Sequence, residues 1–219
     1  MSGGSSQELL DLIRTSGDSA DQLTLIRRCI SGIAFEFWSE DLDLMVALAY
    51  EALRIAGSDD ETLLETANII CFNTSANLAD CWGDDFERSS RHFEHGLAFA
   101  EKAILLRHRL RKPPSSLAMA YWAKGKHLMS LGRMAEARAA MLESAQLTCE
   151  DEMSDGHLIA RGYLAIIDNH RGAAEKVGSA LKTLFSQRTR AEDCRIISDQ
   201  LKIACQTSGS TLASAFELE

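Results

Sequence analysis

The sequence predicts an all-α protein built from stacked antiparallel helical hairpins, and three observations support this fold class. The 219 residues include 29 alanines and 28 leucines but only two valines and two prolines, a composition that favours helices over strands. Apolar residues recur every three or four positions, as in Leu42, Met45, Val46 and Ala49. Helix start and stop signals recur at short, regular intervals. We therefore expect nine or ten amphipathic helices.

Capping signals place these helices along the chain. Ser58–Glu61, Asp84–Glu87 and Thr189–Glu192 each put a capping side chain three residues before a glutamate that can reach back to it. Residues suited to a left-handed helix end follow three of the helices: Gly57, Gly132 and Asn169. The expected helices span about 7–14, 19–37, 40–56, 59–81, 85–111, 115–131, 134–148, 155–168, 172–186 and 190–205. We expect residues 1–6 to be a disordered N-terminus, 7–205 a single domain and 206–219 a polar C-terminal tail.

Charge and composition limit the classes of partner. The formal net charge of −9 repels phosphate backbones and anionic lipid headgroups, so we expect no nucleic acid and no membrane partner. No stretch of 18 uncharged apolar residues occurs, and the first residues contain neither a basic segment nor an apolar run, so we expect a cytoplasmic location. Several of the six cysteines fall among apolar neighbours, so we interpret all six as reduced core residues: Cys29, Cys71, Cys81, Cys149, Cys194 and Cys205.

A small residue recurs at one place in four successive helical hairpins. Gly32, Ala76, Gly125 and Gly162 are each followed seven residues later by a turn residue. A glycine inside a helix costs roughly 1 kcal/mol relative to alanine, so its recurrence predicts a compensating close approach of the second helix of each hairpin.

The chain resembles the tetratricopeptide repeat family in the hairpin from Ala118 to Cys149. This unit has the family's aromatic, glycine, aromatic, turn, alanine and large apolar positions filled by Tyr121, Gly125, Leu128, Gly132, Ala137 and Met141. The resemblance implies a right-handed superhelix of hairpins, an α-solenoid that binds peptides or partner proteins along its concave side.

Motifs for catalysis are missing from the sequence. It contains no His-Glu-x-x-His, Cys-x-x-Cys, Gly-x-Ser-x-Gly or phosphate-binding loop, so we predict no catalytic residues, no metal site and no cofactor. His92 and His95 share a helix face, but no third ligand is evident, and we interpret them as a packed or solvated pair. The basic run Arg107–Lys112 is either a patch for an acidic partner segment or a helix end that satisfies the helix dipole.

The predicted function is a non-enzymatic scaffold or adaptor that holds a peptide or helical segment of another protein, or a second copy of itself. The alternatives are a chaperone for secreted or membrane-inserted clients, and a ligand sensor or enzyme with an internal site. Aligning the small residues places six candidate partner-binding side chains on a common helix face: Asn73, Asn77, Trp122, Lys126, Met129 and Tyr163.

Overall fold

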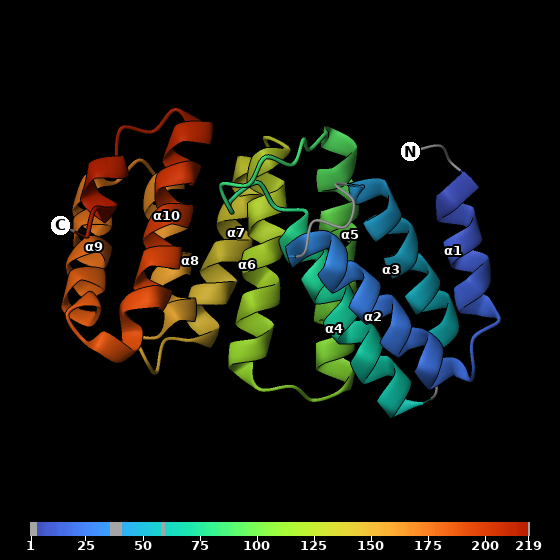
Figure 1. Cartoon of the computed structure of the whole chain (residues 1–219). Helices are drawn as coiled ribbons and strands as arrows, with labels where there is room; N and C mark the ends of the chain where they lie inside the picture. The colour runs from blue at the N-terminus through green and yellow to red at the C-terminus, as the bar shows by residue number, and fades with distance from the viewer. Residues whose placement is uncertain (1–3, 36–40, 58–59, 219) are drawn as a thin grey trace. The chain divides into compact units, whose positions relative to one another are not determined.

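The computed structural model describes residues 4–35, 41–57 and 60–218, and this part of the chain is all-helical, which confirms the predicted fold class (Figure 1). Ten α-helices and two short 3-10 helices occur in these ranges, with no strand. The helices are α1 (Gly4–Arg14), α2 (Ser19–Phe35), α3 (Leu42–Ala56), α4 (Glu61–Asn77), α5 (Ser90–Arg109), α6 (Pro114–Ser130), α7 (Met134–Leu147), α8 (Asp155–Ile167), α9 (Arg171–Phe185) and α10 (Ala191–Ser208). The 3-10 helices are η1 (Arg188–Arg190) and η2 (Ala213–Phe216).

Local capping explains several of the helix ends. The Asp60 carboxylate accepts hydrogen bonds from the first backbone N–H groups of α4, which would otherwise lack partners. Gly132 and Asn169 have φ values of 72° and 46°, as predicted for left-handed helix ends. Gly57 also has a positive φ, 59°, but its ψ of −139° is not that of a left-handed helical residue. The predicted cap at Ser58 lies outside the described residues.

Two predicted capping boxes, at Asp84 and Thr189, do not cap the helices that follow them. Residues 84–87 are irregular, because α4 ends at Asn77 and α5 begins only at Ser90, where the Ser89 backbone N–H donates to His92 Nδ1 at 3.0 Å. Thr189 lies in η1, and α10 begins two residues later. Capping-box spacing in the sequence does not decide where a helix starts when the segment is held by other contacts.

The helices fall into two compact units, which differs from the single domain expected over 7–205. Unit 1 comprises Met1–Leu78 and Phe86–Lys112, and unit 2 comprises Ala79–Asp85 and Pro113–Glu219. The short segment Ala79–Asp85 thus belongs to unit 2 although unit 1 flanks it along the chain. Within each unit, helices that follow one another in sequence pack together, as expected for helical hairpins.

Unit 1 is held by polar contacts as well as by its apolar core. Ser75 Oγ of α4 donates to the Gly96 carbonyl of α5 at 2.8 Å, which requires close approach of the two helices. Arg107, the first residue of the basic run, is buried: its guanidinium lies 4.2 Å from the Phe72 ring centroid and Nε donates to Asn68 Oδ1. The run therefore begins as part of the α4–α5 interface.

The histidine pair of α5 contacts side chains of α3. His92 Nε2 lies 3.4 Å from Asp43 Oδ1, and His95 Nδ1 lies 3.0 Å from the Tyr50 hydroxyl. The His95 and Tyr50 rings also meet edge to face. These contacts agree with the interpretation of the two histidines as a packed pair.

Unit 2 contains the hairpin with the clearest repeat pattern. A Cβ atom on Gly125 of α6 would lie 2.8 Å from Met141 Cε of α7, so the predicted close approach is present. Ser144 Oγ of α7 also donates to the Ala118 carbonyl of α6. Gly162 of α8 packs differently, because a Cβ there would meet Leu201 of α10 rather than a residue of α9.

Both chain ends differ from the prediction. Helix α1 begins at Gly4, so the expected disordered N-terminus over 1–6 includes residues that are helical. The C-terminal segment is packed: Phe216 in η2 is fully buried, and its carbonyl accepts a hydrogen bond from Ser198 Oγ of α10. Gly178 of α9 provides the space, since a Cβ at this residue would overlap the Ala215 carbonyl oxygen. The expected polar tail is thus part of unit 2.

Candidate binding groove

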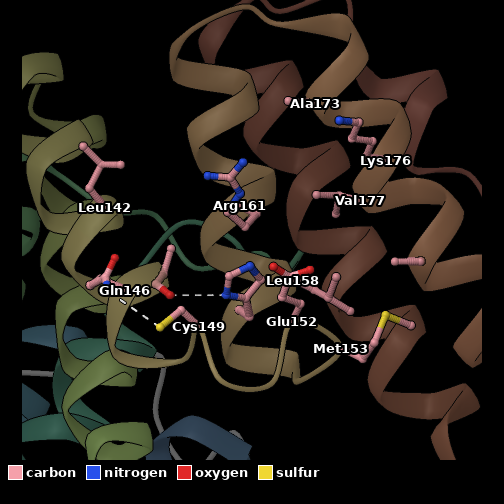
Figure 2. Close-up of a pocket in the computed structure, with 13 residues that line it drawn as sticks. Leu142, Gln146, Cys149, Glu152, Met153, Leu158, Arg161, Ala173, Lys176 and Val177 are labelled. Carbon is pink, nitrogen blue, oxygen red and sulfur yellow. Dashed lines mark hydrogen bonds between the residues drawn. The ribbon is translucent and has the colours of Figure 1, made fainter.

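Unit 2 has an open groove along α8, between α7 and α9. Two adjoining pockets of about 530 and 440 Å³ form it. Both are lined by Leu142, Arg161, Ala173 and Lys176, so the two pockets are continuous. Figure 2 shows Leu142 and Gln146 of α7 on one side, Lys176 and Val177 of α9 on the other, and α8 between them. The thirteen residues of α8 give the groove a length of roughly 20 Å.

The floor helix α8 is fixed at its N-terminal end. The Ser154 side chain accepts a hydrogen bond from the His157 backbone N–H at 3.3 Å and so caps the helix. The His157 ring nitrogen Nδ1 lies 3.2 Å from the Ala145 carbonyl oxygen of α7. These contacts set the position of α8 relative to α7, and Leu158 of α8 is buried beneath the groove.

The groove exposes apolar side chains at both its middle and its end. Leu142 is 40% exposed and Met153 is 38% exposed, although both are large and apolar. Both line the larger pocket. Cys149, which also lines it, is exposed, whereas the other five cysteines are buried and form no disulfide; the prediction of reduced core cysteines is thus confirmed for five of the six.

The groove also carries positive charge. Arg161 and Lys176 are exposed, and within the described residues neither forms an ion pair. In contrast, Arg138 at the far end is neutralised by Asp168, with Nε and Oδ1 2.8 Å apart. The groove therefore has two cations without an ion pair among the described residues and one carboxylate, Glu152, in a protein whose net charge is −9.

The six predicted partner-binding residues lie elsewhere, in two separate sets. Asn73 and Asn77 belong to α4 of unit 1 and are half-buried. Trp122, Lys126, Met129 and Tyr163 belong to unit 2, where their exposed fractions are 1%, 2%, 8% and 0%. These four residues do not form the open face that was predicted by aligning the small residues of the hairpins.

The segment Ala79–Asp85 accounts for this difference. Lys126 Nζ donates to Asp80 Oδ1, and Ser130 Oγ donates to the same oxygen at 2.9 Å. The Trp82 ring meets the Trp122 ring edge to face, with centroids 6.3 Å apart. The segment thus packs on the face formed by Trp122 and Lys126. This face was predicted to be open to a partner, and that prediction is wrong because a segment outside the repeated hairpins covers it.

Electrostatics at this covered face reflect its burial. Burial alone would raise the pKa of Asp80, but the charge of Lys126 and the hydrogen bonds from Lys126 and Ser130 outweigh it and hold that pKa below its ordinary value. Burial raises the pKa of Tyr163 well above 10, and the nearby Cys81 and Asp80 raise it further.

Sequence reasoning missed Leu142, Arg161 and Lys176. The apolar spacing Met134, Ala137, Met141 and Ala145 predicts the buried side of α7; it is right for the last three residues and wrong for Met134, which is 42% exposed. Leu142 does not belong to this spacing. The position of Leu142, a large apolar residue outside this spacing, was the one feature of the sequence that could have indicated the groove. Nothing in the sequence distinguishes Arg161 and Lys176, because exposed arginines and lysines occur throughout the chain.

In the part of the chain that the structure describes, no three His, Cys, Asp or Glu side chains come together as metal ligands. None of the described helices is both long and apolar enough to cross a membrane. Comparisons with protein-family models, with curated proteins and with solved structures gave no match.

Proposed function

We propose that this protein is a non-enzymatic binding protein, and that the α7–α9 groove holds an acidic, amphipathic segment of a partner protein. One observation carries the proposal: the groove combines two unpaired cations, Arg161 and Lys176, with the exposed apolar side chains of Leu142 and Met153. A helix or strand with leucines on one face and glutamates beside them would match both features.

The repeat pattern supports the same function class. Helical-hairpin arrays bury a continuous core and leave surface grooves between successive helices, where partner segments bind. The resemblance of Ala118–Cys149 to a tetratricopeptide unit, together with the Gly125–Met141 packing, is consistent with such an array. We place the binding site in the groove beside α8. That the chain is a tetratricopeptide-like repeat protein is also proposed.

The test uses a designed peptide of about 14 residues with leucines at helical spacing and glutamates on both flanks. Fluorescence anisotropy of the labelled peptide measures its Kd for the full-length protein. A matched peptide carries lysine in place of every glutamate. We expect the glutamate peptide to bind at least tenfold more tightly at low salt, and the difference to shrink as added salt screens the charges.

Charge reversal tests whether the groove is responsible. Arg161→Glu combined with Lys176→Glu should reverse the preference between the two peptides. The control variant, Arg27→Glu with Arg28→Glu, changes the net charge equally at exposed positions of α2 in unit 1 and should leave the preference unchanged. Equal binding of both peptides by the unmodified protein would contradict the proposal and would favour a chaperone that recognises apolar surface alone.

A further inference from the structure

Helix α1 carries an acidic face with an exposed leucine. Leu12 is 59% exposed, and Glu8 lies one turn before it on the same face, because residues four apart are neighbours on a helix. Glu8 is exposed and forms no ion pair among the described residues. Asp11 pairs with Arg14 of the same helix at 3.1 Å, but 60% of its side chain remains exposed. The face therefore presents a leucine beside two accessible carboxylates.

The other side of α1 holds the helix on unit 1. Ile13 is fully buried, and Arg14 Nε lies 3.0 Å from Oε1 of the buried Glu51 of α3. The helix also contacts α2. A partner that contacts Glu8 and Leu12 would thus meet a helix that is already formed, and binding would not have to order it.

Two other aliphatic side chains are exposed on described helices outside the groove, but the charges around them differ. Ile196 of α10 is 43% exposed, and the three carboxylates around it each pair with a nearby arginine or lysine. Leu105 of α5 is 65% exposed and has more basic than acidic side chains within one turn: Glu101, Lys102, His108 and Arg109. Of the three aliphatic residues, Leu12 is the one that lies beside a carboxylate without an ion pair in the described part of the chain.

The α7–α9 groove matches the acidic face of α1 in charge and in length. The groove cations Arg161 and Lys176 would face the two carboxylates of α1, and the exposed Leu142 would face Leu12. The eleven residues of α1 span roughly 16 Å, and the thirteen residues of α8 give the groove roughly 20 Å. The helix therefore fits along the groove without a bend.

Charge also sets the direction of α1 in the groove. Figure 2 shows Glu152 and Met153 at the end where α8 begins, with Lys176 nearer the other end. In α1, Glu8 lies in the N-terminal half and Arg14 is the last residue. Opposite charges meet when Glu8 lies near Lys176 and Arg14 near Glu152, which places α1 antiparallel to α8.

We infer that the α7–α9 groove binds helix α1 of a second copy of this chain. The inference rests on the function proposed for the groove and names its partner. Because α1 and the groove are different surfaces, a single contact leaves one α1 and one groove free, so copies join head to tail or pair through two reciprocal contacts. One helix in a groove is a small interface, so the association should be weak and depend on concentration.

Charge exchange tests the association. Size-exclusion chromatography with light scattering, at low salt and about 1 mM protein, should give a mass above that of one chain, which falls on dilution. Arg161→Glu with Lys176→Glu should remove the increase. Adding Glu8→Lys and Asp11→Lys to that variant should restore it, because the charges on both surfaces are then exchanged. The mass of one chain at every concentration in the unmodified protein, or no restoration in the fourfold variant, would overturn the inference.

The acidic side chains around Ile196 provide the matched control. Glu192→Lys with Asp199→Lys changes the net charge as much as the exchange on α1 does, at exposed positions of α10. Added to Arg161→Glu and Lys176→Glu, this pair should not restore the association. Restoration by this pair would overturn the inference, because it would show that net charge, and not the face of α1, decides whether copies associate.

Disulfide cross-linking tests the position and direction of α1 with every charge unchanged. Cys149 is exposed and lines the groove, next to Glu152 in Figure 2. Thr15 follows the C-terminal end of α1, and Gln7 is exposed near the other end. Under oxidation by copper phenanthroline in air, Thr15→Cys should cross-link to Cys149 of a second copy at least fivefold more than Gln7→Cys, as measured by mass spectrometry of peptides. Equal or reversed yields would overturn the inference.

Failure of this inference is distinguishable from failure of the proposed function. If the designed glutamate peptide binds the groove but the unmodified chain stays a single copy and does not cross-link, the inference fails and the proposed function stands. If the peptide does not bind either, both fail. Where a charge-exchange variant loses its helical circular dichroism signal, the cross-linking yields decide, since they require no change at the contacting charges.

Discussion

At the residue scale, Glu51 of α3 is the clearest electrostatic determinant of unit 1. Its side chain is 6% exposed and lies between two arginines, with Oε1 3.0 Å from Arg14 Nε and 2.6 Å from Arg54 Nη2. Hydrogen bonds from Arg54 and Arg14 lower the pKa of Glu51 to about 2, against an ordinary value of 4.5. Because Arg14 is in α1, this carboxylate also ties α1 to α3.

The lowered pKa gives a pH-dependent prediction. A carboxylate whose pKa is depressed by folding stabilises the native state above its unfolded pKa, and this contribution is lost as the pH falls through its folded pKa. Glu51→Gln should therefore lower the free energy of unfolding by about 2–3 kcal/mol at pH 7. The difference from the unmodified protein should shrink between pH 4.5 and about 2. Urea unfolding followed by circular dichroism at several pH values measures both effects.

A surface ion pair provides the control for Glu51. Glu136 accepts hydrogen bonds from Arg133 at 2.6 and 2.7 Å, but both side chains are about half exposed. Exposed pairs contribute little to stability because water screens them. Glu136→Gln should leave the urea midpoint almost unchanged. An equal loss in both variants would mean that burial does not strengthen the Glu51 contacts.

At the element scale, the sequence predicted which segments are helices better than where they begin and end. Gly132 and Asn169 have the left-handed conformation expected of helix ends because few residues tolerate it, so the signal is local and specific. The capping pattern at Asp84 failed because that residue belongs to a segment whose conformation depends on α6, far away in the sequence. Local signals were reliable only where local interactions decide the structure.

The α6–α7 hairpin supplies the prediction at this scale. Gly125→Leu forces a side chain into the space of Met141, whose Cγ would lie 3.0 Å from the new Cβ, and should destabilise the protein by roughly 1–3 kcal/mol. Combining it with Met141→Ala should cost less than the sum of the two single variants, because the smaller side chain makes room. Urea unfolding measures the three free energies.

Gly172 provides the matched control for Gly125. It lies at the exposed start of α9, where a Cβ would meet the His170 ring at Cε1, 3.5 Å away, and at Nδ1, 3.8 Å away, both ordinary contact distances. Gly172→Ala should therefore leave stability unchanged or raise it slightly, since alanine favours helix. Strict additivity of Gly125→Leu and Met141→Ala would show that the two residues are not in contact, and would remove the structural basis of the repeat register.

At the scale of the whole molecule, the fold class could be predicted from the sequence but the accessible surface could not. Periodicity places Trp122 and Lys126 on one face of α6. Whether that face is open depends on Asp80 and Trp82, which contact it from another part of the chain. Aligning the hairpins by their small residues treats every hairpin as equivalent. Such an alignment cannot predict where the segment Ala79–Asp85 packs, because this segment does not follow the repeat.

The division into two units leads to the last prediction, which concerns their separate stability. Arg14 and Arg54, which pair with Glu51, both belong to unit 1, and Gly125 packs on Met141 within unit 2. Partial unfolding proceeds through groups of residues that share a core, so a substitution should loosen its own unit first. In dilute urea, Glu51→Gln should increase amide hydrogen exchange in α2–α5, and Gly125→Leu should increase it in α6–α8.

Hydrogen exchange followed by mass spectrometry resolves the two sets of helices in one experiment. The informative comparison is between α4 and α6. Glu51→Gln should increase hydrogen exchange in α4, and Gly125→Leu should increase it in α6. Because the segment Ala79–Asp85 belongs to unit 2 although it joins two helices of unit 1, covalent connection alone would predict that both variants affect α4. If both substitutions raise exchange equally in all helices, the chain unfolds as one cooperative body, and the two units are only a geometric division.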